Sequence, residues 1–211
     1  GDGVNGFVRA LTAISSNLYV GGQCSRAGRV AASRIAVFDT SQGGNAGWST
    51  LGDGVNNSVL ALTAIGGDLY VGGSFDQAGG TSADKIALFD TNKSGNIGWS
   101  ALGDGINSPA WFDSVQTLFA VGDDLYVGGS FYQAVGADAD FIAVYDTTQT
   151  GNAGWSALGD GASQTVLALA SIGDELYVGG IFSQAGPQAA SRIAVFDTTQ
   201  TGNPGWSGLG E

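Results

Sequence analysis

The chain has 211 residues, of which 43% are hydrophobic and 12% are charged, and its formal net charge is -12 at pH 7. Its apolar content excludes an intrinsically disordered chain, and its 37 glycines do not follow the three-residue period of collagen. The acidic excess repels nucleic acid and anionic membranes, which are therefore excluded as partners, and no apolar run reaches the roughly 18 residues that a membrane-spanning helix needs.

Four strands are predicted in order along one stretch of the chain. The segment 59–65 (VLALTAI) is apolar, contains β-branched residues and ends at a glycine turn, as a first strand does. A second strand is predicted over 68–75 (DLYVGGSF) and a third over 85–91 (KIALFDT). The glycine-rich segment NKSGNIG then predicts a hairpin loop, and WSALG (99–103) predicts a short fourth strand. Because no segment has the periodicity and caps of a helix, the fold class is all-β.

This four-stranded pattern occurs four times. The aspartates of the recurring GDG phrase are 51, 51 and 56 residues apart, and the extra five residues of the third copy lie between Ile106 and Val115. The repeats span 1–51, 52–102, 103–158 and 159–211. A period of about 50 residues built from strands is typical of a β-propeller, in which each repeat is one blade. We therefore expect a single domain over 1–211 made of four four-stranded blades.

The repeat "LYVGG…IALFD…GWSALG" resembles the kelch motif over essentially the whole chain. It is similar to repeats of secreted and surface proteins and to those of the central domain of galactose oxidase. The resemblance implies a propeller and says little about function. Kelch propellers usually have six or seven blades, so three arrangements stay open: a four-bladed ring, half of an eight-bladed dimer, or a fragment of a longer propeller. Because the chain begins at Gly1 and has no Met, we expect a processed or trimmed form.

The absence of histidine limits the enzyme chemistry that the sequence allows. Histidine-dependent triads and metal sites are excluded, and so is the copper site that a likeness to galactose oxidase would otherwise imply. Cys24 stands where other copies have Phe, which predicts a small buried apolar residue. Paired carboxylates without histidine could still act as in glycosidases. Acidic residues recur in every repeat, however, whereas a catalytic pair is unique, so we expect no enzyme.

Two other sets of repeated polar residues are expected to be structural. The aspartates of the FDT segments end the third strand, where a carboxylate readily binds the backbone of the following turn. The asparagines of the GN pairs lie in hairpin loops that tolerate left-handed backbone. These sets are Asp39, Asp90, Asp146 and Asp197, and Asn45, Asn96, Asn152 and Asn203.

The candidate ligand-binding residues come from two kinds of loop. In a four-stranded blade, the loop that leads to the next blade shares a face with the loop between the second and third strands. Short Asp and Gln side chains beside glycine backbone suit hydroxyl-rich ligands such as sugars, and carboxylates with loop carbonyls also suit calcium. The alternative is that GDG is a turn whose Asp binds backbone donors. The candidates are Asp2, Asp53, Asp104, Asp160, Gln77, Gln133 and Gln184, and the first copy has Arg26 in the Gln position.

The insertion NSPAWFDS (107–114) adds two aromatic candidates, Trp111 and Phe112, on the same predicted face. An exposed aromatic pair can stack on a sugar ring or anchor a protein partner. The alternative is that both side chains fold over the mouth of the channel.

Together these features predict a non-catalytic binding or adhesion module, extracellular or at the cell surface, whose partners are glycans or surface proteins. The first alternative is a structural or self-associating surface protein that uses the propeller as a rigid unit. The second is a histidine-independent, glycosidase-like enzyme. No cofactor is expected unless the GDG carboxylates hold calcium.

Overall fold

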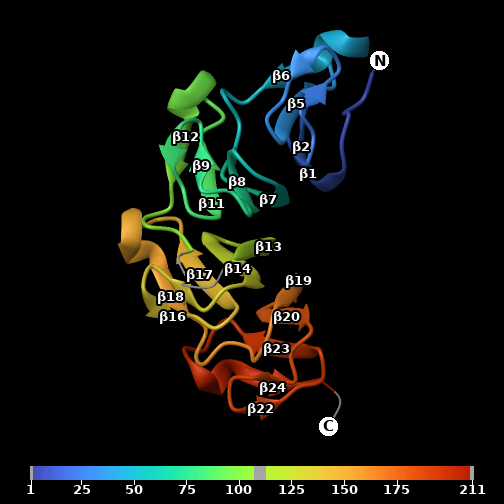
Figure 1. Cartoon of the computed structure of the whole chain (residues 1–211). Helices are drawn as coiled ribbons and strands as arrows, with labels where there is room; N and C mark the ends of the chain where they lie inside the picture. Colours follow the sequence, from blue (N-terminus) through green and yellow to red (C-terminus); the bar gives the residue numbers. More distant parts are fainter. Residues whose placement is uncertain (1, 107–112, 210–211) are drawn as a thin grey trace. The chain divides into compact units, whose positions relative to one another are not determined.

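Four antiparallel sheets of four strands each form the framework of the computed structural model, which describes residues 2–106 and 113–209 (Figure 1). Sheet 1 contains β1 (Val8–Ile14), β2 (Asn17–Gly22), β5 (Ile35–Asp39) and β6 (Trp48–Thr50). Sheet 2 contains β7 (Val59–Ile65), β8 (Asp68–Gly73), β11 (Ile86–Phe89) and β12 (Trp99–Ala101). Sheet 3 contains β13 (Ser114–Val121), β14 (Asp124–Ser130), β17 (Ile142–Asp146) and β18 (Trp155–Ala157). Sheet 4 contains β19 (Val166–Ile172), β20 (Glu175–Gly180), β23 (Ile193–Asp197) and β24 (Trp206–Gly208).

The four strands of each sheet pair in chain order, each antiparallel to the one before it. The all-β prediction is therefore confirmed. Helical structure within the described residues is limited to short 3-10 turns that lead into the fourth strands: η1 (Gly44–Gly47), η2 (Gly95–Gly98), η3 (Gly151–Gly154) and η4 (Asn203–Gly205). The first strand predicted over 59–65 matches β7, whereas β8, β11 and β12 end sooner than predicted.

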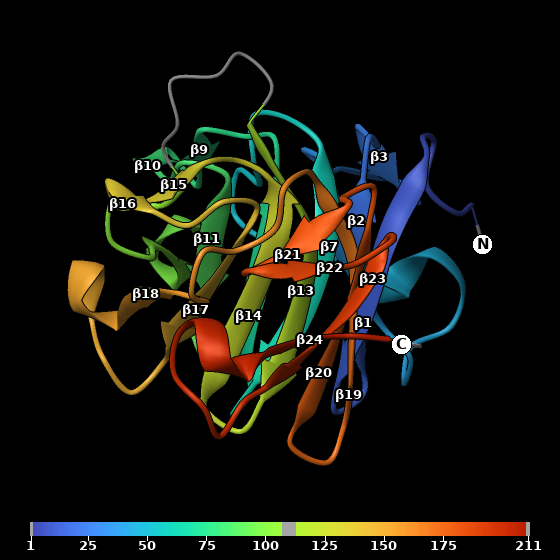
Figure 2. The same cartoon turned by 90° about the horizontal axis from the view of Figure 1, so that it is seen from below.

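A small hairpin between the second and third strands of each sheet was not predicted (Figure 2). Its strands are only two residues long, too short to show a period of two. The hairpins are β3 (Arg26–Ala27) with β4 (Val30–Ala31), β9 (Gln77–Ala78) with β10 (Thr81–Ser82), β15 (Gln133–Ala134) with β16 (Ala137–Asp138), and β21 (Gln184–Ala185) with β22 (Gln188–Ala189). The Gln candidates therefore lie on short paired strands and not in open loops.

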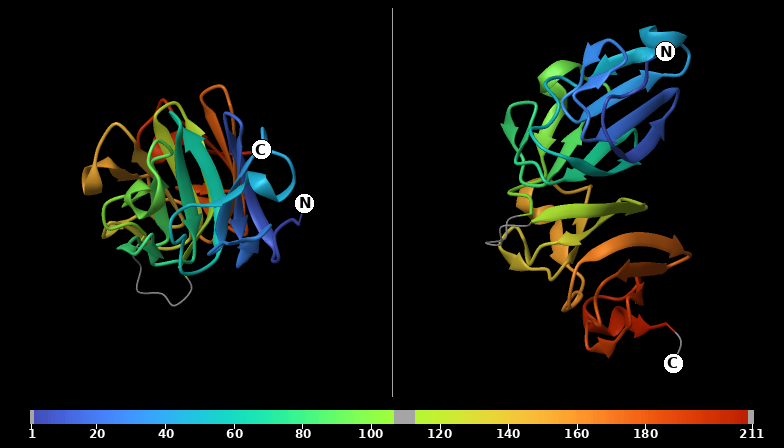
Figure 3. Two further views of the ribbon diagram at one scale, coloured as in Figure 1. Left: turned by 90° about the horizontal axis from the view of Figure 1, so that it is seen from above. Right: turned by 45° about the vertical axis from the view of Figure 1, so that its right-hand side comes forward.

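The chain divides into two compact units, Gly1–Leu102 with sheets 1 and 2 and Gly103–Glu211 with sheets 3 and 4. Each unit has its own core between its two sheets. In the first unit, β7 of sheet 2 runs alongside β1 and β2 of sheet 1 (Figure 3). Tyr19 and Ile35 of sheet 1 pack there with Leu69 and Trp99 of sheet 2.

We call the side of a sheet that carries Tyr19 and Ile35, or their equivalents, its back face, and the side that carries Leu69 and Trp99, or their equivalents, its front face. The second unit repeats the arrangement of the first. The back face of sheet 3 packs on the front face of sheet 4, where the core includes Tyr126, Ile142, Leu176 and Trp206. Within each unit, the back of one sheet is thus covered by the front of the next.

Candidate functional site

The GDG phrase forms a tight turn between consecutive sheets. In the first unit, the backbone N–H of Gly54 donates to the carbonyl of Leu51 over 3.0 Å. Both glycines are left-handed, with φ of 56° at Gly52 and 69° at Gly54. A side chain at Gly52 would collide with Asn96, and one at Gly54 would collide with the carbonyl of Ser33. Glycine is therefore required twice, for its backbone conformation and for close approach.

The aspartate of each GDG turn forms a reciprocal pair of hydrogen bonds with an asparagine of the 3-10 turn. The backbone N–H of Asp53 donates to Oδ1 of Asn96 over 2.7 Å, and Nδ2 of Asn96 donates to Oδ2 of Asp53 over 2.6 Å. We call this arrangement the Asp–Asn clamp. Its other copies are Asp2 with Asn45, Asp104 with Asn152 and Asp160 with Asn203.

The asparagines have a structural role, as expected, but not for the reason predicted. None of them has a positive φ; the left-handed residue is the glycine before each one, with φ of 62° at Gly44, 64° at Gly95, 61° at Gly151 and 68° at Gly202. The GDG carboxylate likewise accepts from a side-chain amide and not from the backbone. Sequence reasoning missed this pairing, although the equal spacing of the two residues in three of the four repeats is a signal for it.

The residue two positions after the GDG phrase binds the start of the small hairpin that carries Gln77 or its equivalent. We call this hairpin the Gln loop. Oδ1 of Asn56 accepts from the backbone N–H groups of Asp76 and Gln77 over 3.1 and 3.2 Å. Asn5 holds Ser25 and Arg26 in the same way, and Ser163 holds Ser183 and Gln184. Isolated bridges of Val4 with Ala27, Val55 with Ala78 and Ala162 with Ala185 complete the contact. The structure therefore places the Asp loops and the Gln loops side by side.

These two loops border a shallow polar hollow beside the GDG turn that precedes each sheet of the first unit. We call this position the entrance to the sheet. At sheet 2 the hollow has a volume of about 330 Å³, and its polar lining is Ser33, Asp53, Asn56 and Gln77. At sheet 1 the hollow has a volume of about 370 Å³, and its polar lining is Asp2, Asn5 and Arg26. The same construction thus carries a neutral Gln at one entrance and a cationic Arg at the other.

The candidate side chains differ in what they contact. Gln77 is exposed, and its amide makes no hydrogen bond within the described residues. Nε2 of Gln133 donates to Oδ1 of Asp138 over 3.4 Å, and Nε2 of Gln184 donates to the carbonyl of Gly186 over 2.9 Å. Trp111 and Phe112 lie outside the described residues.

The entrance to sheet 4 is more acidic than the entrance to sheet 2. Asp140 stands where sheet 2 has Ser33, and its carbonyl accepts from the N–H of Ala162 over 2.9 Å. Burial raises the pKa of Asp140, and the like charges of Asp138 and Asp160 raise it further. A cationic group would relieve this repulsion.

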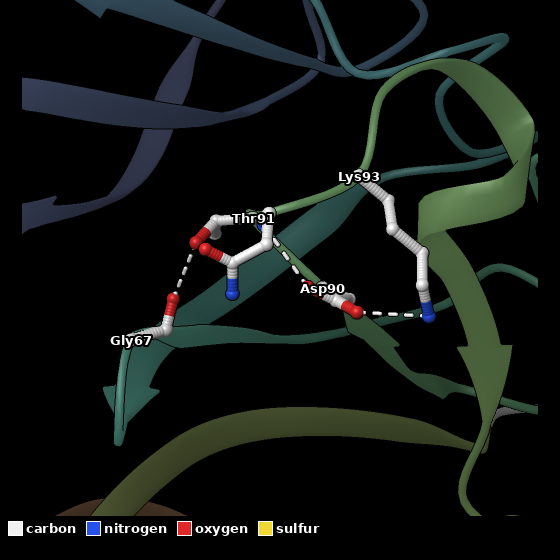
Figure 4. Close-up of polar contacts among 5 residues, drawn as sticks. Gly67, Asp90, Thr91 and Lys93 are labelled. Carbon is white, nitrogen blue, oxygen red and sulfur yellow. Dashed lines mark hydrogen bonds and ion pairs between the residues drawn. The ribbon is translucent and has the colours of Figure 1, made fainter.

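The aspartates of the FDT segments bind the turn that follows them, as predicted. Oδ1 of Asp90 accepts from the N–H of Asn92 over 3.0 Å, and Nζ of Lys93 lies 2.8 Å from its Oδ2 (Figure 4). These hydrogen bonds, first from Lys93 and then from Asn92, hold the pKa of Asp90 below its usual value. The same backbone contact is made by Asp39, Asp146 and Asp197.

Thr91, beside this aspartate, holds the neighbouring turn by donating from Oγ1 to the carbonyl of Gly67 over 2.6 Å (Figure 4).

Cys24 is buried, as predicted, and burial raises the pKa of its thiol. Across residues 2–106 and 113–209, no three His, Cys, Asp or Glu residues gather in a way that could hold a metal ion. In the same ranges, no helix is long and apolar enough to span a membrane.

No family model and no curated protein matches this chain. Among solved structures, the chain resembles one described as the crystal structure of the computationally designed Ika4 protein. The TM-score is 0.53 at 17% sequence identity, over 92% of this chain and 93% of that chain. This likeness concerns the fold alone, and it extends over nearly the whole length of both chains.

Proposed function

We propose that the four sheets are blades of a kelch-like β-propeller that acts as a non-catalytic binding module outside the cell or at its surface. Its ligands are glycans, bound in the hollows between the GDG and Gln loops. The observation that carries this proposal is the recurrence of one polar hollow, built from equivalent residues, at the entrances to sheets 1 and 2. A repeated shallow polar site fits a repeated, hydroxyl-rich ligand better than one deep apolar substrate.

The backbone that borders the hollow at sheet 2 is held in place before any ligand arrives. The Asp–Asn clamp uses Oδ2 of Asp53, and within the described residues Oδ1 accepts no hydrogen bond. The exposed amide of Gln77 offers both a donor and an acceptor. Since Asn56 holds the backbone of Asp76 and Gln77, little backbone order is lost on binding, and the ordering cost falls on the Gln77 side chain.

Screening the purified chain on a glycan array, once with calcium and once with a chelator, tests the proposal. We expect selective binding of one glycan class, and loss of that binding in chelator would assign calcium to the GDG carboxylates. The Gln77→Ala variant should weaken binding at the hollow of sheet 2 about five- to tenfold, as expected for one lost hydrogen bond. Its matched control is Gln200→Ala, an exposed glutamine on the turn before η4. An array without any bound glycan in both conditions would contradict the proposal.

A structural, self-assembling unit is the second candidate function. The observation that favours it is exposed apolar surface on strands at the two ends of the repeat array, including Leu11 of β1 and Ile193 of β23. Exposed apolar surface of this kind marks interaction sites.

A further inference from the structure

The front face of sheet 1 lacks the cover that the front face of sheet 2 has. Val8 is 44% exposed, whereas its equivalent Val59 is fully buried against sheet 1. Leu11 is 57% exposed. Leu18, Phe38 and Trp48 are only partly buried, although their equivalents in sheet 2, Leu69, Phe89 and Trp99, belong to the core of the unit.

A hollow on this face lies where the equivalent surface of sheet 2 is filled by a leucine side chain. In sheet 2, Nε1 of Trp99 donates to the carbonyl of Leu51 over 2.9 Å, and the Leu51 side chain is buried in the same cluster. In sheet 1, the equivalent surface is a hollow of about 260 Å³ lined by Leu18, Phe38 and Trp48. Within the described residues, the indole N–H of Trp48 makes no hydrogen bond.

The back face of sheet 4 is the complementary surface. Ile193 is 43% exposed, whereas its equivalent Ile142 in sheet 3 is fully buried under sheet 4. Leu209, in the position of Leu51 and Leu158, is 47% exposed, whereas those two leucines are 2% exposed.

Gly179 shows the same lack of cover on the back of sheet 4. A side chain at its equivalent Gly128 would collide with Val166 of the next sheet. At Gly179, a Cβ would come no closer than 3.7 Å to any atom, and that atom belongs to its own sheet. The place that a valine of a following sheet fills elsewhere is therefore open here.

We propose that the front face of sheet 1 docks onto the back face of sheet 4 of a second copy of this chain. Val8 then lies over Gly179 of the second copy, as Val166 lies over Gly128, and Leu209 of the second copy fills the hollow beside Trp48. The surfaces complement each other because each unit already joins one such back face to one such front face. Within each unit, the other sheet leaves this surface uncovered, and Val8, Leu11, Ile193 and Leu209 are exposed; we assign the cover to a second copy.

The expected assembly contains two chains. The contact is head-to-tail, because the front face of one copy meets the back face of another. Each copy therefore has one front face and one back face to cover, and a closed ring covers all of them. This count rests on the proposal that the sheets are propeller blades. Two chains would give eight blades, the upper end of the range of about four to eight that propellers usually have, and three chains would exceed it.

Sedimentation equilibrium of the 211-residue chain tests the inference. The expected mass is twice the 21.1 kDa of one chain. Gly179→Val should give single chains, because the valine has room in its own sheet but occupies the place of Val8. Leu11→Asp should do the same from the opposite face. Ile97→Asp is the control, since Ile97 is 76% exposed on η2, which is part of neither face, and it should leave the assembly intact.

Circular dichroism melting separates loss of docking from loss of fold, since Gly179→Val should melt as cooperatively as the parent. Mixing Gly179→Val with Leu11→Asp should restore two-chain particles through one intact contact. A parent chain of single mass at high concentration, or an assembly that both variants leave unchanged, would overturn the inference. Neither variant lies in the polar hollows, so glycan binding by single chains would persist and a failure here leaves the proposed function separately testable.

Discussion

At the scale of single residues, the Asp–Asn clamp explains why the GDG phrase recurs with an asparagine in a distant turn. A turn with two left-handed glycines is entropically costly to order. The clamp gives the N–H of Asp53 a partner and holds the turn against η2 through two hydrogen bonds. The Asp and Asn that recur in all four copies therefore serve first to join sheets. A ligand would bind only the carboxylate oxygen that the clamp does not use.

Asn96→Ala should lower the free energy of unfolding of the chain by about 1 kcal/mol, because the N–H of Asp53 then loses its acceptor at a solvent-accessible site. Urea denaturation followed by tryptophan fluorescence measures the change. Asp53→Ala and the double variant complete a cycle, in which a coupling near zero would show that the two side chains do not interact.

The carboxyl group of Asp90 reports on its contacts with Lys93 and Asn92. Lys93→Gln should raise the pKa of Asp90 towards its ordinary value, because the ammonium hydrogen bond is the largest cause of the lowered pKa. Carboxyl-carbon NMR across an acid titration gives the pKa directly. Asp146, which has Thr148 and no lysine as its main partner, should be unaffected and serves as the internal reference.

At the scale of elements, the small hairpins show how a repeat tolerates one unfavourable residue. The turn between their strands begins with a left-handed residue, with φ of 53° at Gly28, 57° at Gly79 and 52° at Gly186. In the third repeat this position is Val135, with φ of 54°. A β-branched residue in this region of the backbone is strained.

Val135→Gly should raise the free energy of unfolding by about 0.5–1 kcal/mol, since relief of left-handed strain of about 1–2 kcal/mol exceeds the entropic cost of glycine. Chemical denaturation of the variant and the parent measures the difference. Val30→Gly in the equivalent hairpin of sheet 1 is the control: Val30 has a negative φ, so the same substitution should destabilise. A loss of stability in Val135→Gly would show that the valine side chain contributes more than its strain costs.

The existence and order of the main strands could be predicted because apolar strands such as 59–65 end at glycine turns, and both signals are local. The hairpins could not, because a two-residue strand such as Gln77–Ala78 forms only when Asn56 and Val55 approach it from the preceding turn. The predicted neighbourhood of Asp53 and Gln77 followed from strand order alone. Their actual partners, Asn96 and Asn56, did not.

At the scale of the whole molecule, the acidic excess makes stability depend on pH in two opposite ways. One group of aspartates has lowered pKa values through hydrogen bonds to following turns: Asp39, Asp90, Asp146 and Asp197. Another has raised pKa values, mainly through burial and also through neighbouring carboxylates: Asp68, Asp124 and Asp140. The first group stabilises the folded chain when ionised, and the second when protonated.

The urea midpoint should therefore rise slightly as the pH falls from 7 towards about 3.9, the usual pKa of an unfolded aspartate, and then fall at lower pH. The rise occurs because the folded state binds protons at the raised groups more tightly than the unfolded state does. The fall occurs because protonation of the lowered groups removes their hydrogen-bonded carboxylates. Asp140→Asn should reduce the rise, and a midpoint that falls steadily from pH 7 would contradict this assignment.

The sequence by itself determined the repeat, the class of structure, the order of the strands and the burial of Cys24, because strand periodicity, glycine turns and residue type act over a few neighbouring residues. Only the tertiary structure decided which asparagine holds which aspartate, since Asp53 and Asn96 are 43 positions apart and meet through folding. It also decided which faces stay uncovered. Valine and leucine residues at equivalent positions are buried in one repeat and exposed in another, because burial depends on whether a neighbouring sheet covers them.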